Sequence, residues 1–194
     1  MQTISDEYRK LNEQLHEENK HFGNNGAIYL EYVANLIKQT NSRDVLDFGC
    51  GKGALANNLP FPIKQYDPAI PKYSALPEPA DLVVCTDVIE HIEPEFLDNV
   101  LTQIRDLTKK LCYMVISIEP AWKTLPDGRN AHLIVESYDW WWSKIRGYFH
   151  ILNLQHFANR IGYVLAPLDY FDKRKAEKEQ EKQVNQAKDN NDGY

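Results

Sequence analysis

A glycine-rich turn near residue 50 constrains the fold of this chain more than any other sequence feature. Val45–Phe48 is a short, mostly apolar run that favours a β-strand, and glycine occupies every second position of Gly49–Gly53 directly after it. Ala54–Leu59 is typical of a short helix, and Pro60 ends it. Glycines let the backbone turn sharply and let a ligand approach without an intervening Cβ. A strand, a glycine turn and a helix in this order predict a ligand site beyond the strand.

The rest of the chain alternates strand-like and helical patterns. Further strands are expected at 63–66, 82–86, 111–118, 149–157 and 163–168, and further helices at 5–20, 27–39, 94–109 and 137–147. The last two strands are close enough in sequence to pair as an antiparallel hairpin. The pattern therefore predicts an α/β fold, a three-layer Rossmann-like sandwich with a mostly parallel sheet that closes with this hairpin. Such sheets bind ligands beyond the carboxyl ends of their strands.

The chain divides into three segments. We expect residues 1–40 to form N-terminal helices that cover the ligand site, and residues 41–170 to form the core domain. Residues 171–194 are rich in charged and amide side chains and contain almost no apolar residue after Phe171. That composition predicts a solvated helix or a disordered tail.

Composition narrows the classes of partner. The formal charge is −6, which disfavours a general affinity for nucleic acid phosphates. The three cysteines are Cys50, Cys85 and Cys112, and an odd number without a C-x-x-C pair suits neither a disulfide framework nor a zinc site. The first residues have no signal-peptide pattern, and no apolar run approaches the roughly 20 residues of a membrane-spanning helix. We expect a cytoplasmic protein without a membrane partner; the sequence predicts no particular oligomeric state.

Two acidic residues discriminate between ligand classes at the glycine turn. The turn also fits a dinucleotide fingerprint, read as Gly49-x-Gly51-x-x-Ala54. Asp47 lies two residues before the first glycine, where a carboxylate suits an ammonium group and repels a pyrophosphate. Asp67 ends the second strand and can accept hydrogen bonds from ribose hydroxyls, which serves both ligand classes. Asp47 therefore disfavours a nicotinamide-dependent oxidoreductase, although a simple turn-forming role remains open for both acids.

At these residues the sequence resembles a known family. Val45–Gly53 is similar to motif I of class I S-adenosylmethionine-dependent methyltransferases. Ala80–Ile92 resembles their fourth-strand region, which often ends in an acid, a hydrophobic residue, Glu and His. The resemblance covers roughly residues 20–168. It implies an enzyme that transfers a methyl group from S-adenosylmethionine.

The resemblance also implies roles for particular residues. The implied cofactor-binding residues are Asp47, Gly49, Cys50, Gly51, Gly53, Asp67, Pro68, Asp87 and Phe22. Asp47 and the glycine turn would hold the methionine part, and Asp67 would hold the ribose. Asp87 would lie beside the amino acid end of the cofactor or beside the acceptor. Phe22 belongs to a segment that would cover the cofactor.

The chain departs from the family between its second strand and the strand that matches the family's fourth. The family usually has a helix and a further strand there, but prolines interrupt this stretch at positions 68, 71, 77 and 79. We therefore expect a shortened crossover between strands 2 and 4 of the family pattern. Residues 73–76 are the candidates for the wall of the adenine pocket.

Residues beyond the fourth-strand region are candidates for the chemistry at the acceptor. His91 is the first candidate general base, with Glu90 as a group that orients it or binds a metal, and His132 is the second candidate. For Glu90 and His91 the alternative role is helix capping. For His132 the alternative is an ordinary surface loop. These three residues and Glu119 could together bind a divalent ion, but no tight ligand spacing supports it, so we assign no metal site.

Aromatic residues near position 140 are candidates for binding an aromatic acceptor. Trp140–Trp142 are consecutive, so at most two can share one helix surface, and core packing is the alternative. We expect Tyr138 or Trp141 to line the acceptor pocket.

The acceptor class remains open at this level. Small size, acidity and a Glu-His sequence like that of quinone O-methyltransferases favour oxygen or nitrogen of a small-molecule metabolite. Two motifs of DNA methyltransferases are absent, the Asn/Asp-Pro-Pro-aromatic sequence and the Pro-Cys nucleophile. RNA, a nucleotide or a protein remains the alternative acceptor, and a non-catalytic cofactor-binding module is the remaining alternative.

Overall fold

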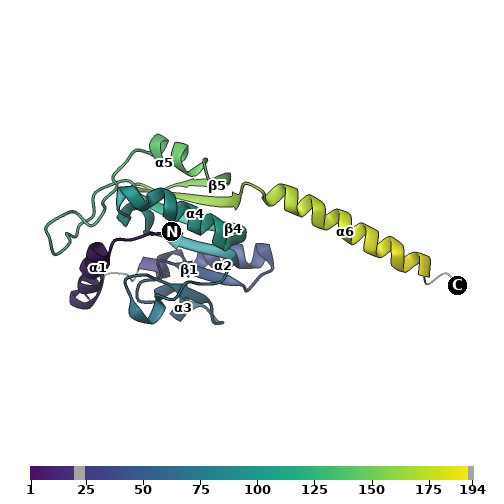
Figure 1. Cartoon of the computed structure of the whole chain (residues 1–194), viewed down its shortest axis with the longest axis horizontal. Helices are drawn as coiled ribbons and strands as arrows, with labels where there is room; N and C mark the ends of the chain where they lie inside the picture. Colours follow the sequence, from purple (N-terminus) through teal and green to yellow (C-terminus); the bar gives the residue numbers. More distant parts are fainter. Residues whose placement is uncertain (20–24, 192–194) are drawn as a thin grey trace.

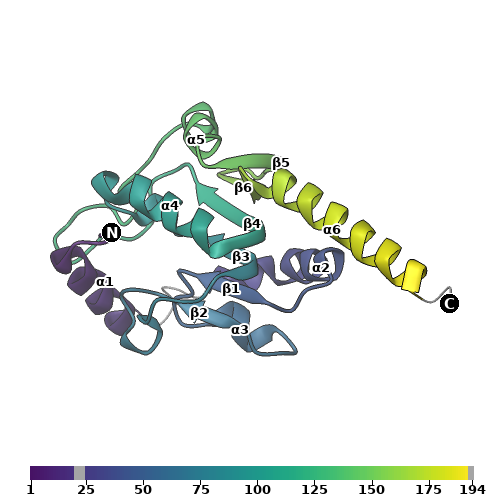
Figure 2. The ribbon, with the colours of Figure 1, turned by 45° about the vertical axis from the view of Figure 1, so that its right-hand side comes forward.

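The computed structural model describes residues 1–19 and 25–191. These residues contain one six-stranded sheet with the order β2-β1-β3-β4-β6-β5. The strands are β1 Val45–Phe48, β2 Lys64–Tyr66, β3 Ala80–Thr86, β4 Thr108–Ser117, β5 Phe149–His156 and β6 Arg160–Pro167. Strands β1 to β4 are parallel, whereas β6 is antiparallel to both β4 and β5. The predicted sheet, parallel with a closing hairpin, is confirmed (Figure 2).

The helices follow the predicted order. They are α1 Asp6–Glu18, α2 Leu30–Thr40, α3 Ala54–Asn58, α4 Leu97–Leu107, α5 Tyr138–Ile145 and α6 Tyr170–Asn191, with short 3-10 turns at η1 Asn25–Tyr29, η2 Pro71–Tyr73, η3 Ile89–His91 and η4 Pro94–Phe96. Ser5 and Ser137 cap α1 and α5, because their side chains accept hydrogen bonds from the backbone N–H groups three residues on. The helix predicted to begin at residue 27 begins as a 3-10 turn and becomes α-helical only at Leu30.

The sheet is buried on both faces and is therefore the middle layer of a three-layer sandwich. Along β3, Val83 and Cys85 face the cluster that contains α4 and α5, and Leu82 and Val84 face the cluster that contains α2. Successive side chains of a strand point to opposite faces, so both sets must be apolar. This explains the nearly continuous apolar run that predicted the strand.

The crossover between β2 and β3 is short, as predicted. Residues 67–79 contain only the 3-10 turn η2, with Pro71 at its first position. No further strand pairs with β2 among the described residues, so β2 forms one edge of the sheet.

The second hairpin strand begins earlier than predicted. The pattern predicted strand 163–168, but β6 begins at Arg160, which pairs with Ser117 of β4. Pairing with β4 extends β6 toward the carboxyl end of the parallel strands. This register places Arg160 at the carboxyl ends of the parallel strands, where the ligand site is predicted.

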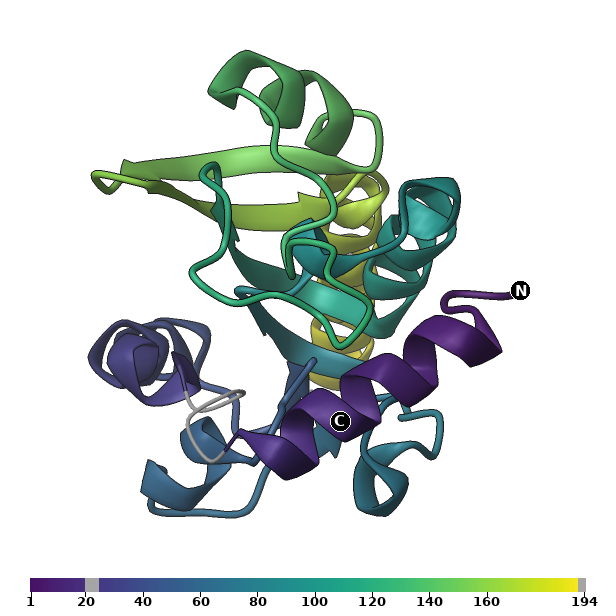
Figure 3. The ribbon, with the colours of Figure 1, turned by 90° about the vertical axis from the view of Figure 1, so that its left-hand side faces the viewer.

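The two terminal helices lie at opposite ends of the molecule. Helix α1 crosses the edge where the parallel strands end, beside the loop that follows β4 (Figure 3). Helix α6 starts after β6. Because β6 is antiparallel to β4, α6 begins where the parallel strands start, and it extends away from the sheet (Figure 1). Of the described helices, none is both long and apolar enough to cross a membrane.

Candidate active site

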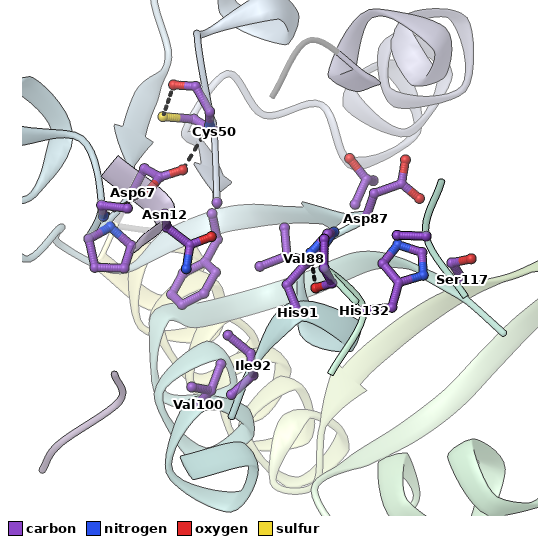
Figure 4. A pocket seen from close by; sticks show the side chains of 18 of the residues that line it. Asn12, Cys50, Asp67, Asp87, Val88, His91, Ile92, Val100, Ser117 and His132 are labelled. Atoms are coloured by element: carbon purple, nitrogen blue, oxygen red, sulfur yellow. Dashed lines mark hydrogen bonds between the residues drawn. The ribbon is translucent and has the colours of Figure 1, made fainter. Parts of the chain in front are cut away.

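A cavity of about 350 Å³ lies where strands β1 to β4 end. Its walls come from the glycine turn after β1, the residues after β2 and β3, helix α1 and the loop after β4. Figure 4 shows Cys50 and Asp67 at one end of this cavity and Asp87 and His132 at the other. The site therefore has two ends, and we name them the cofactor end and the acceptor end after the roles that the sequence resemblance implies.

The glycine turn is held against the end of β2. The backbone N–H groups of Gly49 and Cys50 both donate to the carbonyl oxygen of Tyr66, at 2.8 and 3.0 Å. Gly49 has φ 75°, and a Cβ at this position would lie 2.4 Å from Cγ2 of Val88. Only glycine fits this position, because the backbone conformation and the space both exclude a side chain.

Gly51 and Gly53 have different places in the turn. Gly51 lines the cavity, and its N–H donates to Oδ2 of Asp67 at 3.0 Å. Gly53 is not among the cavity-lining residues; it is the N-cap of α3 with φ 77°. A Cβ on Gly53 would lie 2.6 Å from Nε2 of Gln65, so Gly53 permits the turn to pack closely against Gln65 without contacting the cavity.

Two buried carboxylates mark the cofactor end. Asp47 is only 4% exposed, and burial and the charge of Asp67 raise its pKa to about 7. Burial also raises the pKa of Asp67, against the effect of hydrogen bonds from the N–H groups of Ala69 and Gly51. Each Asp67 oxygen accepts one such bond and keeps acceptor capacity for a hydroxyl group. A cation beside Asp47 would offset the cost of this buried charge, so these residues fit a ligand with an ammonium group and a diol.

An apolar surface adjoins the two carboxylates. Ile4, Ile92 and Val100 line the cavity, together with Pro68 and Ala69 after β2. Residues 73–76, the predicted adenine wall, are not among the lining residues. Because the crossover is short, the N-terminal segment and α4 form this wall of the cavity instead.

Asp87 lies at the acceptor end in an uncommon backbone conformation. Its φ is 54°, and its side chain is 9% exposed. Its carboxylate accepts hydrogen bonds from Oη of Tyr29 at 3.1 Å and from Nε of Arg160 at 3.0 Å. The Arg160 ion pair compensates the charge of Asp87 inside the site.

Two neutral histidines face the same end of the cavity. Nδ1 of His91 lies 2.7 Å from the carbonyl oxygen of Ala131, and Nδ1 of His132 lies 2.5 Å from that of Glu119. A carbonyl oxygen only accepts, so each Nδ1 carries the proton and each Nε2 carries the lone pair. Burial and the neighbouring His132 lower the pKa of His91 to about 3, which keeps its imidazole neutral.

Glu90 lies close to the two histidines and is not among the residues that line the cavity. It is fully buried, and its Oε1 accepts a hydrogen bond from the N–H of Ser117 at 2.9 Å. Burial and the charge of Asp87 raise the pKa of Glu90 to about 8. Ligand atoms of Glu90, His91 and His132 lie within 4.8 Å of one another. The structure thus joins the three acceptor-side residues that the sequence singled out, while Glu119 contributes a backbone carbonyl.

Several lining residues carry no sequence signal. Helix α1 contributes Tyr8, Asn12 and His16, and Oη of Tyr8 donates to the carbonyl oxygen of His91 at 2.5 Å. The loop after β4 contributes Trp122, which is fully exposed, and β6 contributes Arg160. Their positions depend on tertiary packing, so no local pattern could have identified them.

The aromatic run near residue 140 lies elsewhere. Trp141 is fully buried in the core cluster of α4 and α5, and Tyr138 packs against that cluster. Neither lines the cavity, so the expectation that one of them lines the acceptor pocket is wrong. The core-packing alternative describes Trp141. Phe22, predicted to cover the cofactor, lies outside the described residues.

Comparison with known proteins shows the family of the chain. A family profile described as a methyltransferase domain matches residues 13–167. None of the curated proteins matches the sequence.

Solved structures share the fold at low sequence identity. The 1,6-didemethyltoxoflavin-N1-methyltransferase of Burkholderia thailandensis, with bound 1,6-didemethyltoxoflavin and S-adenosylhomocysteine, has a TM-score of 0.64 at 13% identity, over 86% of this chain and 92% of that chain. The complex of DhpI with S-adenosylhomocysteine has a TM-score of 0.56 at 12% identity, over 82% and 95%. A protein from Pyrococcus horikoshii has a TM-score of 0.50 at 15% identity, over 69% and 86%. The matched profile covers most of the chain, so the chain belongs to the methyltransferase domain family, and its fold is that of the class I methyltransferases.

Proposed function

We propose that this enzyme methylates an oxygen or nitrogen atom of a small-molecule metabolite. The observation that carries the proposal is the pair of neutral imidazoles, His91 and His132, at the acceptor end of a cavity of about 350 Å³. That volume is in the range of small-molecule sites, which begins at roughly 300 Å³. The net charge of −6 also favours a small acceptor over a phosphate backbone.

The cofactor end is proposed to hold S-adenosylmethionine in three parts. Asp47 and the turn Gly49–Gly51 hold the amino acid part, because a buried carboxylate and close backbone suit a zwitterion. Asp67 accepts hydrogen bonds from the ribose hydroxyls. The apolar surface of Ile4, Ile92 and Val100 covers the adenine. The bound cofactor supplies a methyl group that its sulfonium already activates.

The acceptor end then has to align the acceptor and remove its proton. Alignment alone is worth about 7–11 kcal/mol when the geometry is good. A hydroxyl or ammonium acceptor also loses a proton, and an imidazole with its lone pair on Nε2 can accept it, although the low pKa of His91 makes this ring the weaker base of the two. His91 is held for this role by its Nδ1 bond to Ala131, and His132 by its bond to Glu119.

A competition between acceptor classes tests this proposal. The enzyme is incubated with cofactor labelled in the methyl group and a panel of phenols, alcohols and heteroaromatic amines, alongside total RNA and a protein extract. We expect label in a small molecule, with at least a tenfold higher rate than in RNA or protein. Label mainly in RNA or protein would contradict the proposal.

A further inference from the structure

We infer that Glu90, His91 and His132 form a binding site for one divalent transition-metal ion at the acceptor end of the cavity. The three residues come from η3 and from the loop after β4, and their ligand atoms lie within 4.8 Å of one another. Donor atoms around a tetrahedral zinc ion lie roughly 3.4 Å apart, given bonds of about 2.0–2.1 Å. Small rotations of the side chains would bring the three donors to that separation.

The two imidazoles are already oriented as metal ligands. Nδ1 of His91 donates to the carbonyl of Ala131, and Nδ1 of His132 donates to the carbonyl of Glu119. Metal-binding histidines almost always donate their other ring N–H to a carbonyl or carboxylate, which fixes the tautomer and the ring. Here both rings carry the lone pair on Nε2 and meet at a centroid distance of 4.7 Å.

Glu90 supplies an independent observation. Its residue is fully buried, and within the described part of the chain its Oε2 has no hydrogen-bond partner. A buried carboxylate oxygen without a partner is costly, and buried charges are normally paired or coordinate a metal. The N–H of Ser117 holds the other oxygen at 2.9 Å and so fixes the carboxylate beside the two histidines.

The donor set indicates the class of ion. Two imidazoles and one carboxylate suit Zn²⁺, Mn²⁺ or Fe²⁺, whereas Mg²⁺ and Ca²⁺ prefer oxygen donors. Three protein ligands leave at least one coordination position open. On the proposed function, an oxygen or nitrogen of the acceptor would occupy that position and lose its proton to solvent water more readily. A ligating Nε2 cannot accept that proton as well, so the imidazoles would then act as ligands.

Calorimetric titration tests the site without cofactor or acceptor. Zn²⁺ and Mn²⁺ are titrated separately into the full chain, prepared without a histidine tag and stripped with chelator. We expect binding of one ion per chain. His132→Ala should weaken it more than about 100-fold, because even partners that only orient a ligand account for 10- to 100-fold. The matched control is His150→Ala, a histidine on β5 whose Nε2 bonds to the carbonyl of Leu168, and it should bind like the parent.

Thermal unfolding distinguishes loss of the metal site from misfolding of the variant. His132 is the more exposed of the two histidines, so His132→Ala should unfold at the same temperature as the stripped parent. Zn²⁺ should then raise the unfolding temperature of the parent and of His150→Ala, but not that of His132→Ala. Equal binding by all three proteins, or no saturable binding by the parent, would overturn the inference.

The two proposals fail separately. Turnover of a small molecule that persists in excess chelator, together with no metal binding, would overturn the metal site and leave the proposed function standing. One-to-one metal binding with label only in RNA or protein would support the metal site and overturn the proposed function.

Discussion

The two ends of the cavity are built in different ways. The polar groups of the cofactor end come from one continuous stretch, residues 47–69, in which a strand, a turn, a helix and a second strand follow one another. The acceptor end combines Asp87, His91, His132 and Arg160, which come from three separate segments. A local pattern can therefore specify the proposed cofactor site, whereas the proposed acceptor site exists only after the sheet and its loops have assembled.

The electrostatics of the two ends also differ. The cofactor end contains two buried carboxylates whose pKa values are raised, so it favours a cation. At the acceptor end, Arg160 pairs with Asp87 and the imidazoles are neutral. We expect substitutions at one end to leave the function of the other end intact, and the following variants test that separation.

His91→Ala should have the largest effect on catalysis. Loss of a group that accepts the proton or holds the ion should lower turnover by about 100-fold or more. The affinity for S-adenosylhomocysteine should change less than about threefold, since the cofactor end is untouched. Single-turnover methyl transfer and calorimetry measure the two quantities. A parallel loss of both would mean that the two ends are not separable.

Gly49→Ala should be the most damaging change at the cofactor end. The positive φ costs about 1–2 kcal/mol for a non-glycine residue. The contact of the new Cβ with Val88 adds about 1–3 kcal/mol. Gly128→Ala is the matched control, because Gly128 also has a positive φ, 89°, but nothing lies within 4 Å of its Cβ position. Urea unfolding should show the larger loss for Gly49→Ala; equal losses would mean that Val88 simply moves aside.

Asp47→Asn should separate cofactor binding from stability. Removing the charge should weaken binding of S-adenosylhomocysteine by about 10- to 100-fold, the value of a charged hydrogen bond. The free protein at pH 8 should become no less stable, because a buried carboxylate whose charge is disfavoured by burial and by Asp67 is removed. Asp81→Asn is the control, since Asp81 pairs with Lys110 outside the cavity. Weaker binding in both variants would point to a general charge effect.

The pH dependence should follow Asp47, whose folded-state pKa is about 7 against about 3.9 in an unfolded chain. The folded protein binds this proton more tightly, so the contribution to stability is full below pH 4 and is lost as the pH rises through 7. Binding of a cationic ligand has the opposite sign. The affinity for S-adenosylhomocysteine should therefore fall as the pH drops from 8 to 6, by up to about tenfold per unit below 7. A flat profile in the parent, equal to that of Asp47→Asn, would contradict the assignment.

Tyr29→Phe should have the smallest effect. Its hydroxyl donates to Asp87, but Arg160 remains paired with that carboxylate, so the loss should be about 1 kcal/mol of stability. Tyr163→Phe is the control, because within the described residues the buried hydroxyl of Tyr163 has no hydrogen-bond partner. That change should be neutral or stabilising in chemical unfolding. Equal effects would mean that the bond to Asp87 contributes nothing.

The same comparison explains what the sequence could predict. The glycine turn, Asp47 and Asp67 form a local pattern, and the alternation of strands and helices predicted the sheet and its closing hairpin. His91 and His132 were recognised as candidates one by one. Their approach to within 4.8 Å of each other and of Glu90 depends on the loop after β4, whose path no periodicity encodes.

The remaining misses have the same physical cause. Arg160 reaches Asp87 because β6 pairs with β4 from Ser117 onward, a register that the sequence did not predict. Trp141 is an aromatic residue in a helix, and only packing against the core decides that it is buried rather than in the site. Such positions depend on contacts between segments far apart in the chain.

The most direct test of the two-ended site is one calorimetric comparison of the parent, Asp47→Asn and His91→Ala with S-adenosylhomocysteine at pH 8. We expect equal affinity for the parent and His91→Ala, and at least tenfold weaker binding by Asp47→Asn. Equal affinity for all three proteins, or a loss confined to His91→Ala, would contradict it.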